Sequence, residues 1–419
     1  MTAPAHPSPD NTIFSLFAGD NPEVIANPFP TVAQLRAMGP VVRLPFPLYG
    51  LGQGWVVTRM EEVIQVLRDH ARFTVDPRSI GGHDAFATRG AGSDAPTTFF
   101  DTNSMLRVDE PDHRRLRALV SKAFTPRYME SLRPRVQEIA DALLDRVQEQ
   151  GQMDLVKDYA APLPINVISE MLGVPEADRP QIHTWSTILA RGLVAGHPDP
   201  EVLASLQAFG TYTAQLVAVK RRQPADDLIS QLIAIEAEGD RLSESELLSM
   251  ITLLIFAGHE TTSNLIATGA LLLLDHPTQL AKLTANLDLV PSAVEELLRF
   301  DGPAYMTGPR FATQDTELAG QSIKQGELVL PVLISANHDE TQFSQPEDLD
   351  VARSIQRHMA FGQGIHMCLG APLARVEGTI AFTTLLKRMP KLRLAVPRDQ
   401  ITWHFNLNSR SLASLPVEF

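Results

Sequence analysis

Residues Phe361–Gly370 read FGQGIHMCLG and contain Cys368, the only cysteine in a chain of 419 residues. One cysteine cannot close an intrachain disulfide. It also offers too few thiolates for a structural zinc or an iron–sulfur cluster held by cysteines alone. Three roles remain for Cys368: inert packing, a catalytic nucleophile, or one ligand to a metal that has other donors.

Glycines surround this cysteine. We expect Gly362, Gly364 and Gly370 to adopt positive φ and to let a flat ligand approach backbone amides that donate to the sulfur. A thiolate at the start of the helix predicted after Gly370 also gains from the helix dipole. The GQG triplet is not a dinucleotide-binding loop, because Met367 occupies the place of the third glycine. Taken alone, the segment favours a buried packing cysteine.

The composition is that of a soluble globular protein, with 44% hydrophobic and 20% charged residues. No linker-like or low-complexity run divides the chain, so we expect a single domain over residues 1–419 with an N-terminal tail over about residues 1–25. The net charge of −13 argues against nucleic-acid binding, which needs a basic surface. The first residues resemble neither a secretory signal nor a membrane anchor, which predicts a cytoplasmic, reducing location.

The apolar pattern predicts mostly helices with a smaller β-rich part. Two apolar stretches within residues 41–60 predict a β-hairpin, and residues 60–70 predict a helix. Helical spacing dominates from Pro111 to Pro277. Short β-like pieces follow over residues 309–331, and a helix is expected over residues 371–389.

The longest predicted helix covers about residues 243–275. Ser243 and Glu246 make a capping box at its start, and His276-Pro277 ends it. At 1.5 Å per residue this helix would be roughly 45–50 Å long. Its apolar stretch is long enough to cross a bilayer, but His259 and Glu260 lie at the centre, where charge is most costly in lipid. We therefore expect a buried helix with a polar centre.

The polar centre reads AGHETT. It is not a zinc-protease HExxH motif, because Ser263 stands where the second histidine should be. Ala257 and Gly258 leave room on one face of the helix, and the hydroxyl of Thr261 can bond back to the carbonyl of Ala257 and open a notch. Glu260 adds a proton donor or acceptor beside this notch.

A third segment, EELLR, places Glu296 and Arg299 three residues apart on a helix, close enough to pair. Pairs of this kind lie mostly on the surface and contribute little to stability. Taken singly, this segment indicates nothing about function.

Together the three segments resemble the haem-thiolate monooxygenases, the cytochromes P450, and in particular their soluble bacterial members. Their order and spacing agree with that family over nearly the whole chain. The positions that match the motif Phe-x-x-Gly-x-His/Arg-x-Cys-x-Gly are Phe361, Gly364, His366, Cys368 and Gly370. The positions that match the oxygen-binding and Glu-x-x-Arg motifs are Ala257, Gly258, Glu260, Thr261, Thr262, Glu296 and Arg299. The resemblance implies that Glu296 and Arg299 are a structural pair.

The resemblance implies an α+β, predominantly helical P450 fold with a smaller β-rich subdomain. Haem b is then expected between the long helix and the loop over residues 361–370. Cys368 is the implied proximal ligand, and thiolate donation to iron favours cleavage of the O–O bond. The family positions that hold the haem propionates, where cations face carboxylates, correspond to His113, Arg117, Arg310 and His366.

One position departs from the family pattern. The family usually has an arginine, in a Pro-Glu-Arg-Phe element, that joins the Glu-x-x-Arg pair. Asp348 stands there in this chain and cannot be the cation. Arg353, Arg357 and His358 are the candidates for its replacement.

The implied reaction is monooxygenation. Two electrons reduce O2, Thr261 and Glu260 organise proton delivery, and one oxygen atom enters a C–H or C=C bond of a hydrophobic small molecule. The sequence contains neither a flavin domain nor a fused ferredoxin, so a separate ferredoxin and an NAD(P)H-dependent reductase are expected to supply electrons to a monomer. A basic patch for an acidic ferredoxin is expected at Arg114, Arg115, Lys122 and Arg127.

Two alternatives remain from the sequence. A peroxide-using haem-thiolate enzyme typically replaces the acid–alcohol pair with an arginine-centred one, so Glu260 and Thr261 argue against it. A haem-binding sensor without turnover has no need for that pair. The substrate is not identified by the sequence, and its contacts are expected from residues 77–107, 185–199 and 303–308.

Overall fold

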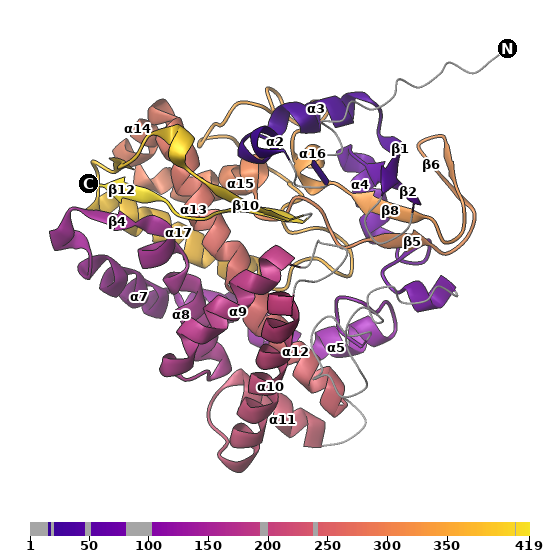
Figure 1. The fold of residues 1–419 in the computed structure, drawn as a ribbon, viewed down its shortest axis with the longest axis horizontal. Coiled ribbons are helices and arrows are strands. Elements are labelled where there is room, and N and C mark those ends of the chain that lie inside the picture. Colours follow the sequence, from indigo (N-terminus) through magenta and orange to yellow (C-terminus); the bar gives the residue numbers. More distant parts are fainter. Residues whose placement is uncertain are drawn as a thin grey trace.

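A computed structural model describes residues 16–17, 21–46, 52–80, 103–192, 200–237, 242–406 and 408–419. Helices form one large part of the molecule, and strands β1, β2, β5 and β8 lie together with α4 and α16 at the other side (Figure 1). This arrangement confirms the predicted helix-rich α+β fold with a smaller β-rich part. The N-terminal tail is shorter than predicted, because a helix already begins at Pro22, capped by the side chain of Asn21.

The α-helices of the described residues are α2 (Pro22–Ala26), α3 (Phe29–Ala37), α4 (Met60–Arg68), α5 (Asp112–Ser121), α6 (Pro126–Ser131), α7 (Arg133–Asp145), α8 (Pro162–Leu172), α9 (Arg179–Gly192), α10 (Pro200–Arg222), α11 (Leu228–Ala237), α12 (Glu244–Ala257), α13 (Glu260–Asp275), α14 (Pro277–Ala285), α15 (Val290–Asp301), α16 (Leu333–Asn337) and α17 (Ala371–Arg388). The strands are β1 (Val41–Phe46), β2 (Gly52–Val57), β3 (Phe73–Thr74), β4 (Gln152–Asp154), β5 (Arg310–Ala312), β6 (Thr316–Leu318), β7 (Gln321–Ile323), β8 (Leu328–Pro331), β9 (Arg393–Leu394), β10 (Trp403–Asn406), β11 (Ser409–Leu412) and β12 (Pro416–Glu418).

The largest sheet has five strands in the order β1-β2-β8-β5-β3. β1 and β2 pair antiparallel from Val41 opposite Val57, which confirms the predicted hairpin. Side chains alternate across the sheet, so Val42 packs in one apolar cluster while Val41 and Val57 pack in another on the opposite side. Both faces of this sheet are therefore buried.

The helical part has one large apolar core. α13 packs against α8, α15 and α17, and α17 packs in turn against α7. The predicted helix over residues 371–389 is confirmed as α17. Among the described residues, α10 is the one helix whose length and apolar composition would allow it to cross a membrane. It packs instead against α9, α11 and α12.

The predicted helix over residues 243–275 has the expected ends but is not continuous. The capping box of Ser243 and Glu246 is present, and the last residue is Asp275. α12 ends at Ala257 and α13 begins at Glu260, so the prediction of one rod was wrong. These two helices are only about 21 and 24 Å long at 1.5 Å per residue.

Side chains cause the break by taking backbone acceptors. The ring Nδ1 of His259 lies 2.8 Å from the carbonyl oxygen of Ile255, the acceptor that a continuous helix would offer to the His259 amide. The hydroxyl of Thr261 donates to the carbonyl of Ala257 at 3.4 Å, which confirms the predicted notch. Ser263 also donates its hydroxyl to the carbonyl of His259 at 2.8 Å, but its amide keeps the helical bond to the same carbonyl at 2.9 Å. The side chains of His259 and Thr261 thus open the helix at one point.

The glycines around Cys368 only partly follow the prediction. Gly362 and Gly364 have φ of +64° and +75°, as expected. Gly370 has φ of −81° and forms the N-cap of α17, so the prediction of positive φ there was wrong. A Cβ on Gly364 would lie 2.1 Å from the carbonyl oxygen of Leu67. Glycine is therefore required at this position for the loop to pack against α4.

Glu296 and Arg299 are fully buried, and the pair is not a surface feature. Both carboxylate oxygens of Glu296 accept from Arg299, at 2.7 and 2.8 Å. Arg353 donates to the same carboxylate at 3.1 Å and also to the backbone carbonyl of Asp348. Arg353 therefore supplies the cation that Asp348 cannot. The other candidates, Arg357 and His358, pair elsewhere, with Glu61 and Glu295.

We predict that Glu296→Ala lowers the free energy of unfolding by about 3–5 kcal/mol, because it leaves the buried guanidinium of Arg299 and the partly buried guanidinium of Arg353 without their shared anion. Chemical denaturation measures this change. Glu130→Ala is a matched control, because Glu130 pairs with Arg133 at the same spacing but on the surface. Its cost should stay below about 1 kcal/mol. Equal costs for the two variants would contradict a structural role for the buried pair.

Candidate active site

A cavity of about 320 Å³ lies where the helix break faces the cysteine loop. Cys368 and Thr261 both line it, although 107 residues separate them in sequence (368 − 261). The remaining lining is mostly apolar and comes from α8, α12, α13, α15 and the loops around them. It includes Met105, Leu106, Phe124, Ile168, Leu253, Leu254, Leu265, Leu298, Pro303, Ala304, Met306, Leu333, Leu369 and Leu373.

Cys368 is exposed at the wall of this cavity. Its amide donates to the carbonyl of Phe361 at 2.9 Å, which closes the loop. Although Cys368 is exposed at the cavity, the protein packed around the thiol desolvates it and raises its pKa, while the amides of Gly370 and Ala371 and the charge of Arg117 oppose that shift. The same amides and guanidinium are therefore placed to stabilise a thiolate.

Arg310, His113 and His366 form a buried polar group behind the cysteine loop. The rings of His113 and His366 meet edge to face at 4.3 Å between centroids. Asp109 lies 3.4 Å from the ring Nε2 of His366. Burial first, and then the neighbouring charges of His366 and Arg117, lower the pKa of His113 to about 4. The structure thus brings three of the four predicted propionate ligands together.

The environment of the Arg310 guanidinium tests whether the residues of this site fit a haem. Arg310 is only 2% exposed, and its Nε and one Nη have no hydrogen-bond partner among the described residues. Burial lowers its pKa to about 10. A buried cation with unused donors calls for an anion, and a carboxylate is the natural one. The residues present therefore fit a group that carries carboxylates and lies against Cys368.

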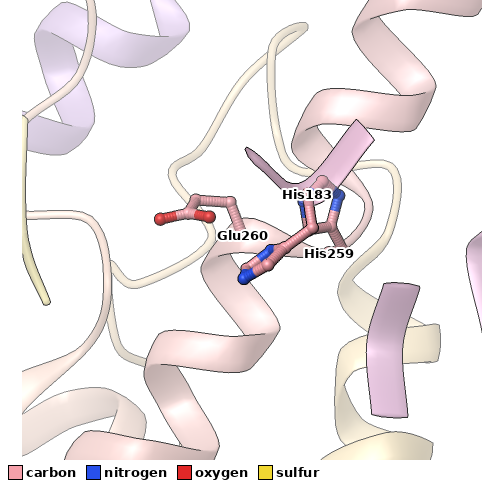
Figure 2. Close-up of side chains that lie close together, drawn as sticks. All are labelled: His183, His259 and Glu260. Carbon is pink, nitrogen blue, oxygen red and sulfur yellow. The ribbon is translucent and has the colours of Figure 1, made fainter. Parts of the chain in front are cut away.

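The fourth predicted propionate ligand, Arg117, lies at the cavity wall and donates to the backbone carbonyl of Met367 at 2.7 Å. It therefore contacts the cysteine loop directly. Glu260 does not line the cavity. Its carboxylate lies beside His183 and His259, next to the helix break (Figure 2). The structure thus places Thr261 at the cavity and Glu260 just behind it.

Sequence reasoning missed several charged residues near the site. Asp109 precedes α5 in a polar loop, and its contact with His366 spans 257 positions. Glu377 lies fully buried in α17, where burial raises its pKa well above the usual value and the hydroxyl of Thr262 opposes the shift. A lone glutamate inside a helix reads as solvated, so no local signal marks Glu377 as buried.

Glu295 was missed for the same reason. It receives two hydrogen bonds from Arg375, at 2.7 and 2.9 Å, and lies 3.0 Å from His358. The guanidinium of Arg375 also lies over the ring of Phe361, 4.6 Å from its centroid. Glu295 therefore anchors the cation that packs on the first residue of the cysteine loop.

The chain was compared with known proteins. A family model described as Cytochrome P450 matches residues 213–400. Cytochrome P450 CYP107DY1 of Priestia megaterium is 47% identical over 384 residues, which cover 91% of this chain and 93% of that protein. The chain belongs to the cytochrome P450 family. Its members bind haem through a cysteine thiolate, and Cys368 is the only cysteine that this P450 offers.

Further relatives agree with this P450 along nearly its whole length. The vitamin D(3) 25-hydroxylase of Pseudonocardia autotrophica is 41% identical and covers 93% of both chains. A crystal structure of the myxobacterial cytochrome P450 CYP267B1 in complex with myristic acid superposes with a TM-score of 0.87 at 43% identity. It covers 95% of this chain and 98% of the other. The fold and the haem-thiolate monooxygenase class predicted from the sequence are thereby confirmed.

We predict that Glu295 stabilises this P450 at neutral pH and loses that effect in acid. Burial disfavours its charge, but hydrogen bonds from His358 and Arg375 outweigh burial and lower the pKa of Glu295 from about 4.5 to about 2. A carboxyl whose pKa is lower in the folded state stabilises fully above its unfolded pKa, and the effect disappears as the pH falls toward the folded value.

Glu295→Gln should therefore unfold more easily at pH 7 and show a shallower loss of stability between pH 5 and pH 2. Urea denaturation at several pH values measures both effects. Glu61→Gln is a suitable control, because Glu61 pairs with Arg357 at the surface. It should cost less than about 1 kcal/mol. An acid profile identical to that of the native protein in Glu295→Gln would rule out the lowered pKa.

Proposed function

We propose that this P450 hydroxylates or epoxidises a hydrophobic small molecule in the cytoplasm, with O2 as the oxygen source. The observation that carries the proposal is one apolar cavity whose wall contains both Cys368 and the helix break at Thr261. The haem, when bound, activates O2 with two electrons so that one oxygen atom enters the substrate and the other leaves as water.

Several residues of this chain are proposed to hold the haem. Cys368 would bind the iron, and other residues of the loop from Phe361 to Gly370 that line the cavity would contact the haem. Arg310 supplies a buried cation for one propionate, because its donors have no other partner among the described residues. His113, His366 and Arg117 lie close enough to the same region to complete the anchoring.

Thr261 and Glu260 are proposed to move protons to the oxygen that leaves as water. The hydroxyl of Thr261 is exposed to the cavity and bonds only loosely to the carbonyl of Ala257, at 3.4 Å. It can therefore turn toward a ligand in the cavity. Glu260 is the first residue of α13 and directly precedes Thr261. Its carboxylate lies on the side of the break that faces His183 and His259. A side-chain rotation of Glu260 would connect this outer side with Thr261.

The lining of the cavity supports a hydrophobic substrate. Met105 and Leu106 come from the predicted region 77–107, and Pro303, Ala304, Met306 and Thr307 come from residues 303–308. Residues 81–102 and 193–199 of the predicted regions lie outside the described residues. Trp185 does not line this cavity and instead stacks on Phe209. The myristic acid bound to CYP267B1 and the name of the vitamin D(3) 25-hydroxylase also favour an apolar substrate.

Electrons are proposed to come from a separate ferredoxin and an NAD(P)H-dependent reductase. The proposed landing patch is smaller than the sequence indicated. Arg115 is paired with Asp112 and Glu246, and Arg114 with Glu110. Lys122 and Arg127, beside α6, then remain the main cations for an acidic partner.

We predict that reduced protein with bound CO shows the Soret band of thiolate-ligated haem, and that Cys368→His moves it to the position of histidine-ligated haem. The reason is that Cys368 lies at the cavity wall and carries the only thiol in the sequence. The absorption spectrum of fresh protein measures this. A histidine-type band in the native protein would overturn the proposed ligand.

We predict that Thr261→Ala keeps consuming NADPH but forms little product and releases hydrogen peroxide instead. Without the hydroxyl, the reduced oxygen is no longer protonated at the correct atom. The substrate is taken from a hydrophobic library screened for ligand-induced spin-state shifts. Product, NADPH and H2O2 are then quantified with a surrogate ferredoxin and reductase. Glu260→Gln should instead slow turnover, by about 10²–10⁴-fold if it supplies the proton.

Thr284→Ala is the matched control, because Thr284 also donates to the carbonyl four residues earlier but lies outside the cavity. Its ratio of product to NADPH should equal that of the native enzyme. Full coupling in Thr261→Ala would remove Thr261 from the mechanism and favour the peroxide-using alternative. Absence of NADPH consumption in the native protein with every ligand would favour a haem-binding sensor.

A further inference from the structure

Three side chains with metal-binding chemistry meet on the outer side of the helix break. His183 lies on α9, His259 lies between α12 and α13, and Glu260 is the first residue of α13. One nitrogen of each imidazole and one carboxylate oxygen all lie within 4.8 Å of one another. Figure 2 shows the three side chains together at the break. None of them lines the cavity that contains Cys368.

The imidazole of His259 is held in a form that can bind a metal ion. Its Nδ1 lies 2.8 Å from the carbonyl oxygen of Ile255, and a carbonyl can only accept. Nδ1 therefore carries the proton, and Nε2 carries the lone pair. His259 is 0% exposed, and its Nε2 has no hydrogen-bond partner in the part of the chain that the structure describes. A buried acceptor left without a partner is costly, so it calls for an explanation.

We propose that His183, His259 and Glu260 bind one divalent transition-metal ion of the Zn²⁺ class. Two imidazoles and one carboxylate form a known zinc ligand set, in which water takes the fourth position. A ligating histidine typically donates its other ring N–H to a backbone carbonyl, as His259 does to Ile255.

The spacing of the three groups needs only a small adjustment. Ligand atoms around a tetrahedral zinc lie about 3.3 Å apart, given bonds of about 2.0–2.1 Å. These atoms now lie within 4.8 Å of one another, and the centroids of the two imidazole rings are 6.0 Å apart. His259 is fixed by its own hydrogen bond, and the packing of α9 against α8 and α10 fixes the backbone of His183. Rotations of the long Glu260 side chain and of the partly buried His183 ring would bring the three ligand atoms together.

The ion would join two elements that lie far apart in the sequence. α9 supplies one ligand and the helix break supplies two, so metal binding clamps α9 to the break. It also holds the Glu260 carboxylate on the side away from Thr261. Zinc should therefore slow turnover, and this consequence, unlike the binding itself, rests on the proposed role of Glu260.

Calorimetric titration of tag-free, chelator-treated holoenzyme with ZnCl2 at pH 7 tests the site. We expect one tight Zn²⁺ per chain. His183→Gln and His259→Gln should each weaken binding by at least about 10-fold, since even groups that only orient zinc ligands contribute 10- to 100-fold. His276→Gln is the matched control, because His276 bonds to the carbonyl four residues earlier in the same way but lies outside the cluster. Its affinity should equal that of the native protein.

Equal affinity in His183→Gln and the native protein would overturn the proposal. His183 is only partly buried, so this variant tests the site even where His259→Gln fails to fold. Anomalous scattering at the zinc edge from soaked crystals should place the ion between the three side chains, and a peak elsewhere would also overturn it. Tight binding without slower turnover would leave the metal site standing and contradict the role of Glu260 in proton delivery.

Discussion

The buried charge cluster of Glu296, Arg299 and Arg353 is the interaction on which the rest of the site depends. One carboxylate without solvent access receives hydrogen bonds from two guanidinium groups, and their remaining donors bond to the carbonyls of the loop over residues 337–348. A buried charge is tolerated only when it is paired and its hydrogen bonds are satisfied. The cluster on α15 therefore fixes the path of the chain that leads from the end of α16 toward the cysteine loop.

The cysteine loop is positioned from two sides. Gly364 allows close contact with the backbone of α4, and Arg375, held by Glu295, packs on the ring of Phe361. These contacts hold the loop that carries Cys368 at the wall of the cavity. Arg310 is buried, and two of its donor groups have no partner among the described residues. The protein therefore holds a positive charge in a position to pair with a carboxylate-bearing ligand. Such charge costs free energy in the protein alone and is recovered when the anion binds.

The break between α12 and α13 changes the contacts on both faces of the helix. On the inner face, Thr261 and Ala257 open a notch toward the cavity. On the outer face, His259 turns its ring to the carbonyl of Ile255 and meets His183 and Glu260. The same departure from helical hydrogen bonding thus creates a notch at the cavity on one side and a cluster of two imidazoles and a carboxylate on the other. α9, which carries His183, is well placed to influence Glu260.

The sequence by itself determined the family, the hairpin, both ends of the long helix and the identity of the thiolate, because glycines, caps and motif spacings are local signals. The sequence also indicated the candidate site residues, but not which of them are buried or which residues they contact. Only the tertiary structure decided that Glu296 and Arg299 are buried together. It also decided that Arg353 is the cation in place of the usual arginine at position 348, and that Asp109 contacts His366. The helix break and the meeting of His183 with His259 were decided there as well. These features depend on contacts between residues far apart in the chain, and burial, which alone separates a structural ion pair from a surface one, has no local signature in the sequence.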